Sequence, residues 1–273
     1  MAEILHRYVD VLGLRTHYVE AGEGPVLVLL HSGEFGASAE LSWEFTIPQL
    51  SSHFRVIAPD WLGFGESAKV FDFTGMQGFR IRHIGALLET LGIPKANFAG
   101  NSMGGGQLLR AAAKPELPWP IDKMVLIGAG GRAPKNDARR TLDSYDGTRE
   151  QMEQIVRVLI QREELRTDPA YIDRRHRSSL EPGAWEATAA PRFTMPGRAG
   201  VPRQETPLEN VRCPTLIIAG ALDPLREPGF GDELHRQIKG SELIVIEEAG
   251  HCPQIDAPQI VNRAVIDFLV QPS

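Results

Sequence analysis

Short apolar runs separated by glycine, proline and polar residues recur along the first 130 residues or so of the 273-residue chain, and again from about residue 208 to its end. Runs of four to eight residues rich in valine, isoleucine and leucine predict buried strands, here at 25–30, 56–58, 97–99, 123–127, 214–219 and 243–246. Residues 8–12 and 14–20 predict a hairpin across Gly13. Helical segments alternate with the strands, as at 76–91, which Gly92 and Pro94 end. This alternation predicts a mostly parallel central sheet with flanking helices, an α/β fold.

The middle of the chain has a different pattern. Residues 131–207 contain few β-branched runs and many arginines, and they include the helix-like stretches 148–162 and 168–180. We predict no strand there. Helices inserted between two strands of a sheet are typical of a lid over the carboxyl ends of the strands, where loops carry function. We therefore predict a core of residues 1–130 and 208–273, with a helical lid at 131–207.

Composition excludes several classes of function. The net charge of −6 leaves no basic surface for nucleic acid, and no apolar run approaches the roughly 20 residues that cross a bilayer. The start of the chain does not resemble a signal peptide, and two cysteines make neither a disulfide framework nor a paired-cysteine metal site. The histidines lack metal-ligand spacing, and no dinucleotide motif is present. We expect a cytoplasmic protein with a small-molecule substrate, no metal and no cofactor.

The segment 97–113 carries the strongest chemical signal. A short strand leads to Gly100-Asn101-Ser102-Met103-Gly104, and a helical stretch follows. A serine at the apex of such a turn holds its hydroxyl clear of the sheet, and glycines two residues before and after it leave room for close packing. We predict that Ser102 is a nucleophile.

Two later residues complete the chemistry that a serine nucleophile needs. Asp223 follows the strand at 214–219, and His251 follows the strand at 243–246 after a short loop. Histidine can accept the serine proton, and a carboxylate can fix its tautomer and stabilise the imidazolium. Asp60 also ends a strand and is the rival acid, although a turn-capping role is the simpler interpretation for it. The chain order of serine, aspartate and histidine fits one known arrangement of such triads.

On these motifs the chain resembles the α/β-hydrolases over nearly its whole length. The run 25–33, which ends in His31-Ser32-Gly33, resembles the third strand and oxyanion loop of that superfamily. The resemblance implies an oxyanion hole made by the backbone amides of Gly33 and Met103. We interpret His31 as a residue that holds the loop by hydrogen bonds.

Within the superfamily, the elbow around Ser102 is similar to that of the meta-cleavage product hydrolases, which split a carbon-carbon bond in 2-hydroxy-6-oxo-hexa-2,4-dienoates during aromatic degradation. Part of the lid, 171–187, is also similar to that group. The resemblance implies a lid arginine on the substrate carboxylate, and dimers are common in the group. The candidate substrate-binding residues are Asn101, Arg175, Arg192, Arg198 and Cys252.

Three functions stay open at this point. The first is carbon-carbon bond hydrolysis, the second is hydrolysis of a small ester or lactone by the same residues, and the third is a non-catalytic receptor on the same fold. Glu34 stands in the oxyanion loop, where its charge would oppose an oxyanion unless the side chain is turned away or paired. Cys252 also departs from the group, which usually has tryptophan after the histidine.

Overall fold

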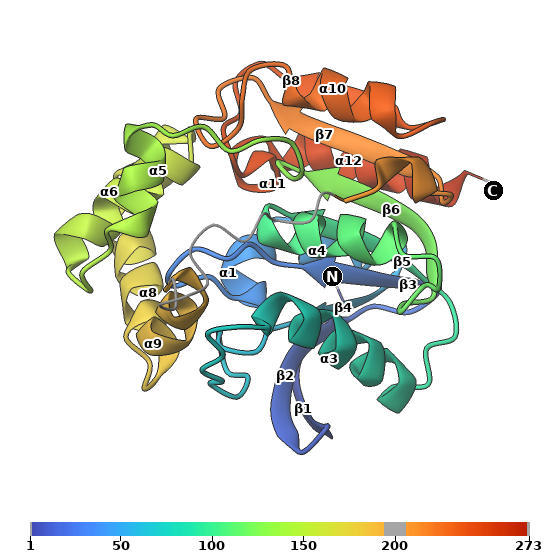
Figure 1. The fold of residues 1–273 in the computed structure, drawn as a ribbon, viewed down its shortest axis with the longest axis horizontal. Helices are drawn as coiled ribbons and strands as arrows, with labels where there is room; N and C mark the ends of the chain where they lie inside the picture. The colour runs from blue at the N-terminus through green and yellow to red at the C-terminus, as the bar shows by residue number, and fades with distance from the viewer. Residues whose placement is uncertain (1, 194–205, 272–273) are drawn as a thin grey trace.

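An eight-stranded sheet forms the centre of the protein (Figure 1). The computed structural model describes residues 2–193 and 206–271. The order across the sheet is β1-β2-β4-β3-β5-β6-β7-β8, and every neighbouring pair from β4 to β8 is parallel. The strands are β1 (Ile4–Val11), β2 (Leu14–Ala21), β3 (Val26–Leu30), β4 (Arg55–Pro59), β5 (Ala96–Asn101), β6 (Ile121–Ile127), β7 (Thr215–Gly220) and β8 (Glu242–Ile246). The predicted mostly parallel sheet is confirmed.

Helices cover both faces of the sheet, which explains why its central strands are apolar throughout. In β3, Val28 and Leu30 belong to one apolar cluster, and Leu27 and Leu29 belong to the cluster on the opposite face. The first cluster includes residues of α3 (Met76–Thr90), α4 (Met103–Ala112) and α10 (Phe230–Gln237). The second includes residues of α1 (Ala39–Trp43), α2 (Ile47–Leu50) and α12 (Pro258–Val270).

The hairpin predicted across Gly13 is present and longer than expected. Strands β1 and β2 pair antiparallel with Val11 opposite Leu14, so Leu12 and Gly13 form the turn. Both turn residues have positive φ, 55° and 77°, which is the backbone that a tight hairpin turn requires. The antiparallel register places His6 diagonally across from His17, since His6 faces Val19 and Tyr8 faces His17.

Within the described residues between β6 and β7 there are several helices and no strand. Figure 1 shows α5, α6, α8 and α9 beyond the ends of the strands toward which the β6 and β7 arrows point. Thr148 and Asp168 cap α6 and α8, each accepting a hydrogen bond from a backbone amide of its helix. The bounds are α5 (Asp137–Asp143), α6 (Arg149–Leu159), α7 (Glu163–Arg166), α8 (Pro169–Ser179) and α9 (Ala184–Ala189).

These helices share an apolar cluster with the sheet domain. Met152, Ile155 and Tyr171 from the helices are buried with Phe35, from the loop after β3, and with Ile255, from the segment after β8. The remaining elements are two 3-10 turns and a short helix, η1 (Ala190–Arg192), η2 (Leu208–Asn210) and α11 (Pro253–Asp256). No helix within 2–193 or 206–271 combines the length and apolarity needed to span a bilayer.

Candidate active site

Ser102 lies in the sharp turn that the sequence predicts. It connects β5 to α4 with a φ of 52° and a ψ of −111°, a positive φ that few residues other than glycine adopt. The flanking glycines allow the turn to pack closely. A Cβ on Gly100 would meet the backbone of Gly104 and Gly105, and a Cβ on Gly104 would overlap the Leu30 carbonyl group.

The packing of this turn predicts opposite effects for two neighbouring glycines. Gly104→Ala should lower the free energy of unfolding by about 1–3 kcal/mol, because the new methyl group meets the β3 backbone. Gly106→Ala is the matched control. Its Cβ would lie 3.6 Å from the Arg110 guanidinium, so the higher helix propensity of alanine should leave stability unchanged or raise it by up to about 1 kcal/mol. Urea unfolding of both variants measures the difference, and equal stabilities would contradict this account.

The structure brings Ser102, His251 and Asp223 together from three separate loops. The distance from His251 Nε2 to Ser102 Oγ is 2.7 Å, and from His251 Nδ1 to Asp223 Oδ2 it is 2.8 Å. The Asp223 and His251 side chains are 1% and 2% exposed. In this geometry the carboxylate accepts from Nδ1–H, and Nε2 is left to accept the serine proton.

Asp223 is held in its charged form. Burial raises the pKa of its carboxyl, but the neighbouring His251 and Arg226 side chains and the Leu225 amide outweigh burial and bring the pKa below its usual value. The Leu225 amide donates to Oδ1 at 2.8 Å. Asp223 therefore remains an acceptor for His251 at neutral pH.

The rival acid, Asp60, has different partners. Its carboxylate accepts from His17 Nδ1 at 2.7 Å and from the Ala39 amide at 2.7 Å. His31 forms hydrogen bonds that hold the loop after β3, as predicted. Its Nδ1 donates to the Ser32 carbonyl at 2.6 Å, and its Nε2 accepts from the Trp61 amide at 3.0 Å. Burial holds the pKa of His31 below its usual value, so the ring is neutral. Neither residue is bonded to His251.

The two predicted oxyanion-hole residues lie side by side. Gly33 and Met103 line the same cavity as Ser102, and a Cβ on Gly33 would lie 2.6 Å from Met103 Sδ. Met103 is the first residue of α4, so its amide has no partner within the helix and lies at the positive end of the helix dipole. The Met103 amide is therefore suited to bind an oxygen attached to the carbon that Ser102 attacks, and Gly33 lies beside it.

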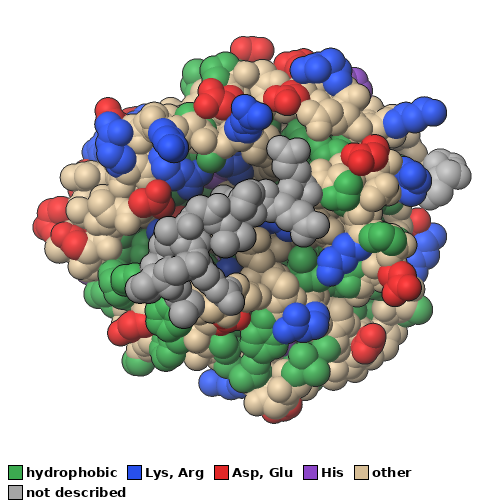
Figure 2. Space-filling view, viewed as in Figure 1, with side chains coloured by type: hydrophobic (Ala, Val, Ile, Leu, Met, Phe, Trp, Pro, Cys, Tyr) green, Lys and Arg blue, Asp and Glu red, His purple; other side chains and the backbone are tan. Residues whose placement is uncertain are grey.

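The cavity beside Ser102 has a volume of about 360 Å³ and a cationic wall. Among the described residues that line it, a single carboxylate, Glu34, accompanies five arginines: Arg80, Arg110, Arg139, Arg192 and Arg226. On the one face that Figure 2 draws, basic and acidic side chains are interspersed. The described lining of this cavity is therefore rich in arginine and poor in acidic residues.

Three of these arginines are held mainly by backbone carbonyl groups. Arg192 donates to the carbonyl oxygens of Leu142 at 3.1 Å and of Gly33 at 3.2 Å, so it connects the helical region to the oxyanion loop. Arg80 donates to the Leu62 carbonyl, and burial lowers its pKa to about 10. Arg226 donates to the Leu225 carbonyl, and its buried Nε has no hydrogen-bond partner among the described residues. All three remain positively charged at neutral pH.

The charge of Glu34 is compensated by Arg175, a residue that was predicted to bind the substrate. Arg175 Nη1 donates to Glu34 Oε1 at 2.8 Å, and the two side chains are 1% and 3% exposed. Burial raises the pKa of Glu34, but Arg175 and Ser32 outweigh it and hold the pKa below its usual value. Arg175 also donates to the Tyr171 hydroxyl at 3.0 Å and is absent from the described lining of the Ser102 cavity. The structure therefore corrects its predicted role: Arg175 compensates Glu34.

Asn101 and Cys252 are also buried behind the cavity. Asn101 Nδ2 donates to the backbone carbonyls of Ile127 at 3.0 Å and of His251 at 3.1 Å. Cys252 Sγ lies 3.7 Å from Asn101 Oδ1, and burial raises the pKa of its thiol well above the usual value. These contacts give both residues a role in positioning His251 in place of the predicted contact with substrate. Arg198 lies outside the described residues.

Sequence reasoning missed four of the five arginines in the cavity wall. Arg226 stands three residues after Asp223, and this position in the loop after β7 was a usable signal. Arg80, Arg110 and Arg139 belong to α3, α4 and α5, and the packing of these helices decides which of their side chains line the cavity. No local pattern in the sequence marks them.

The fold and this site are typical of the α/β-hydrolases. In that class a serine at the turn between a strand and a helix is hydrogen-bonded to a histidine, and the histidine to an aspartate. The α/β-hydrolase fold family matches residues 25–258, and the chain belongs to that family.

Relatives named for their activity show which hydrolases within the family this chain is similar to. The chain is 31% identical to the 2-hydroxy-6-oxo-6-(2'-aminophenyl)hexa-2,4-dienoic acid hydrolase of Metapseudomonas resinovorans, covering 97% of this chain and 91% of that protein. It is 28% identical to a 2-hydroxymuconate semialdehyde hydrolase of a Pseudomonas species, covering 97% and 94%. A structure of the meta-cleavage product hydrolase from Pseudomonas fluorescens, complexed with acetates, superposes with a TM-score of 0.86 at 28% identity, covering 96% and 97%. The protein is a hydrolase, and these relatives are meta-cleavage product hydrolases.

Proposed function

We propose that this protein hydrolyses a carbon-carbon bond in an anionic dienoate formed by ring fission of an aromatic compound. The observation that carries the proposal is the cationic wall of the cavity at Ser102, where the described lining includes five arginines and one carboxylate, Glu34, which is paired with Arg175. Guanidinium groups suit carboxylates because their planar donors match both oxygens. The relatives named above act on dienoic acids and a muconate semialdehyde, which is the same substrate class.

The proposed chemistry uses only this chain's residues. After the dienol substrate ketonises, Ser102 Oγ adds to the carbonyl carbon while His251 Nε2 takes the hydroxyl proton, and Asp223 stabilises the imidazolium. The Met103 and Gly33 amides hold the oxyanion. The carbon-carbon bond then breaks, and the departing carbanion takes the proton from His251. Water, activated by His251, adds to the acyl-enzyme and releases the acid and Ser102.

The same residues could cleave an ester or lactone, so the substrates must be compared directly. A coloured ring-fission dienoate and p-nitrophenyl butyrate are supplied to the wild-type protein in parallel. Rapid bleaching of the dienoate with slow ester turnover is the expected result. Fast ester turnover with no bleaching would reject carbon-carbon bond hydrolysis and favour the esterase alternative.

Arg192 offers a test of charge recognition. Arg192→Gln should raise KM for the dienoate by about 10-fold or more, because a charge-assisted hydrogen bond to a buried carboxylate is lost. KM for the uncharged butyrate ester should change little. Arg174→Gln, on α8 and outside the cavity lining, is the matched control. If Arg192→Gln weakened both substrates equally, Arg192 would act through the Gly33 loop and not through its charge.

The finer predictions on organisation are part of the same proposal. We propose that residues 131–207 act as a lid; within the described part, Leu142, Leu159, Thr188, Pro191 and Arg192 line the cavity from that region. A homodimer and a cytoplasmic location remain predictions. Sedimentation and cell fractionation test them.

A further inference from the structure

A second cluster of chemically active side chains lies away from the Ser102 cavity. It joins β1, β2 and the loop after β4, and its members are His6, His17 and Glu66. One nitrogen of each histidine and one carboxylate oxygen all lie within 4.8 Å of one another. We propose that this cluster binds a divalent transition-metal ion, for which Zn²⁺ is the probe.

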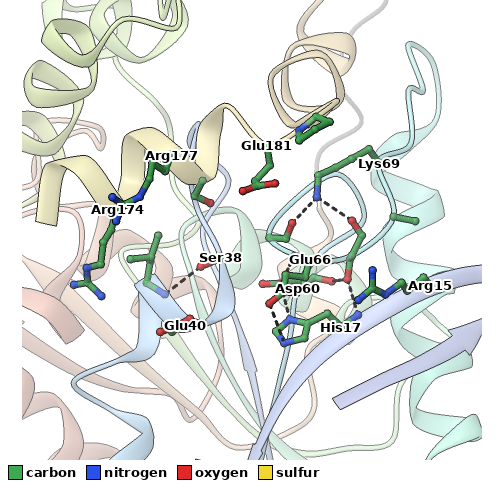
Figure 3. A pocket seen from close by; sticks show the side chains of 16 residues that line it. Arg15, His17, Ser38, Glu40, Asp60, Glu66, Lys69, Arg174, Arg177 and Glu181 are labelled. Carbon is green, nitrogen blue, oxygen red and sulfur yellow. Dashed lines mark hydrogen bonds and ion pairs between the residues drawn. The ribbon is translucent and has the colours of Figure 1, made fainter. Parts of the chain in front are cut away.

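His17 is prepared as a metal ligand by a buried partner. Its Nδ1 donates to Asp60 Oδ2 at 2.7 Å, and the two side chains are 3% and 2% exposed. This bond fixes the tautomer, so the lone pair is on Nε2, the atom that faces the other two members. A carboxylate on the second nitrogen of a ligating histidine orients the ring and raises its basicity in many zinc sites. Figure 3 draws the Asp60–His17 bond with Glu66 close to the pair.

The other two ligand atoms are near His17 Nε2. His6 Nδ1 lies 2.9 Å from it, and Glu66 Oε1 lies 4.0 Å from it. Ligands of tetrahedral zinc, at about 2.0–2.2 Å from the metal, lie roughly 3.3 Å apart. To bind zinc, His6 Nδ1 must move slightly away from His17 Nε2, and the Glu66 carboxylate must move closer. Both side chains can move because His6 and Glu66 are exposed.

Glu66 is held in place without being neutralised by a basic side chain. The Tyr8 hydroxyl donates to Oε2 at 2.6 Å, and the Glu66 amide donates to Asp60 Oδ2 at 2.8 Å. Within the described chain, no lysine or arginine forms a direct ion pair with Glu66: Lys69 is close enough to attract it but donates to backbone carbonyl groups, and Arg15 lies over the Tyr8 ring. Its charge is therefore available to a metal ion.

Solvent and metal can reach the cluster. His17 and Glu66 line an open pocket of about 630 Å³ between the sheet domain and α8, so water can supply the fourth ligand. Two imidazoles and one carboxylate suit zinc and its neighbours better than Mg²⁺ or Ca²⁺, which prefer oxygen ligands. The site would join the amino-terminal hairpin to the loop after β4.

The test is zinc binding by the full-length protein, with any affinity tag removed and metal stripped by chelation. Titration calorimetry should show one Zn²⁺ per chain with micromolar affinity, and bound Co²⁺ should show visible d–d absorption. His6→Ala and Glu66→Gln should each weaken zinc binding by about 10-fold or more. The matched control, His53→Ala, removes an exposed histidine elsewhere and should leave affinity unchanged.

Thermal unfolding gives a second readout, since a metal that binds only the folded protein raises Tm. Zinc should raise the Tm of the wild type and of His53→Ala but not of His6→Ala. The proposal is overturned if the wild type binds no zinc at micromolar concentrations, or if His6→Ala and Glu66→Gln bind zinc as tightly as the control. Because both variants change exposed side chains, loss of folding is not expected to obscure the result.

Discussion

Ser102→Ala is expected to lower kcat on the dienoate by about 10⁴-fold or more, and His251→Ala should cost about as much. Each substitution removes one end of the hydrogen bond that joins Ser102 Oγ to His251 Nε2 at 2.7 Å. Without the base the hydroxyl is a poor nucleophile, and without the hydroxyl the base has no proton to accept. The residual rate should come from the oxyanion hole and substrate binding.

The double variant makes this prediction sharper. Residues that act as a unit have non-additive effects, so Ser102→Ala/His251→Ala should be about as slow as either single variant. Multiplying losses would contradict a relay between them. Ser52→Ala, an exposed serine elsewhere, should retain full activity. A fluorophosphonate should label the wild type and Ser52→Ala but not Ser102→Ala; equal labelling of all three would remove the case for Ser102 and leave the receptor alternative open.

Arg175→Met is expected to lower the free energy of unfolding by about 3–5 kcal/mol, because it leaves the Glu34 carboxylate buried without its partner. Replacing both residues, as in Glu34→Gln/Arg175→Met, should recover most of the loss, since neither charge is then stranded. Arg174→Met is the matched control. Its pair with Glu44 is partly exposed, and it should cost under about 1 kcal/mol. Urea unfolding of the set decides, and equal losses for Arg174→Met and Arg175→Met would contradict the account.

The same pair gives a signed pH dependence. In the wild type the pKa of Glu34 lies below its usual value, so the pair contributes stability above the unfolded pKa, about 4.3, and loses it as pH falls through the folded pKa. In Arg175→Met, burial is opposed by Ser32 without Arg175 and should raise the pKa of Glu34, so stability falls as pH rises through the folded value. The stability difference between the two proteins should therefore be larger near pH 8 than near pH 5.

The pairing of Glu34 with Arg175 removes an objection to an anionic substrate. A free carboxylate in the oxyanion loop would repel both the oxyanion and a dienoate. With Arg175 bound to it, the net charge of the cavity wall comes from the other arginines, Arg192 and Arg226 among them. Arg192 also donates to the Gly33 carbonyl, so the arginine proposed to recognise substrate also contacts the oxyanion loop.

Much of the fold followed from local patterns. The apolar runs predicted the central strands because strands covered on both faces are apolar throughout, and β3 and β7 confirm this. The elbow at Ser102 was readable because glycines must flank a turn packed this closely, and the contacts of Gly100 and Gly104 agree. Helices α6 and α8 lie within the predicted helix-like stretches 148–162 and 168–180, and the structure shows Thr148 and Asp168 capping them.

Predictions that depended on which way a side chain points in the folded protein were less successful. A charged side chain in a helical segment gives no sign of whether it faces solvent, a cavity or another charge. Arg175 was therefore assigned to substrate, although it faces Glu34, which is 141 positions earlier in the chain. Arg80 was overlooked because only the packing of α3 places it beside Met103. The histidines showed no metal-ligand spacing, yet the antiparallel register brings His6 beside His17.

From their positions after two strands, Asp223 and His251 were predicted as the partners of Ser102, with Asp60 as the rival acid. The order of strands and helices and the strained turn at Ser102 followed from the sequence alone. These features are local, since backbone preferences and short apolar runs act within a few residues. Tertiary packing, and no local pattern, sets which charged side chains come together: Arg175 with Glu34, and five arginines around one cavity. Charge compensation and cavity shape depend on distances between remote segments, and those distances are set by the packing of the whole chain.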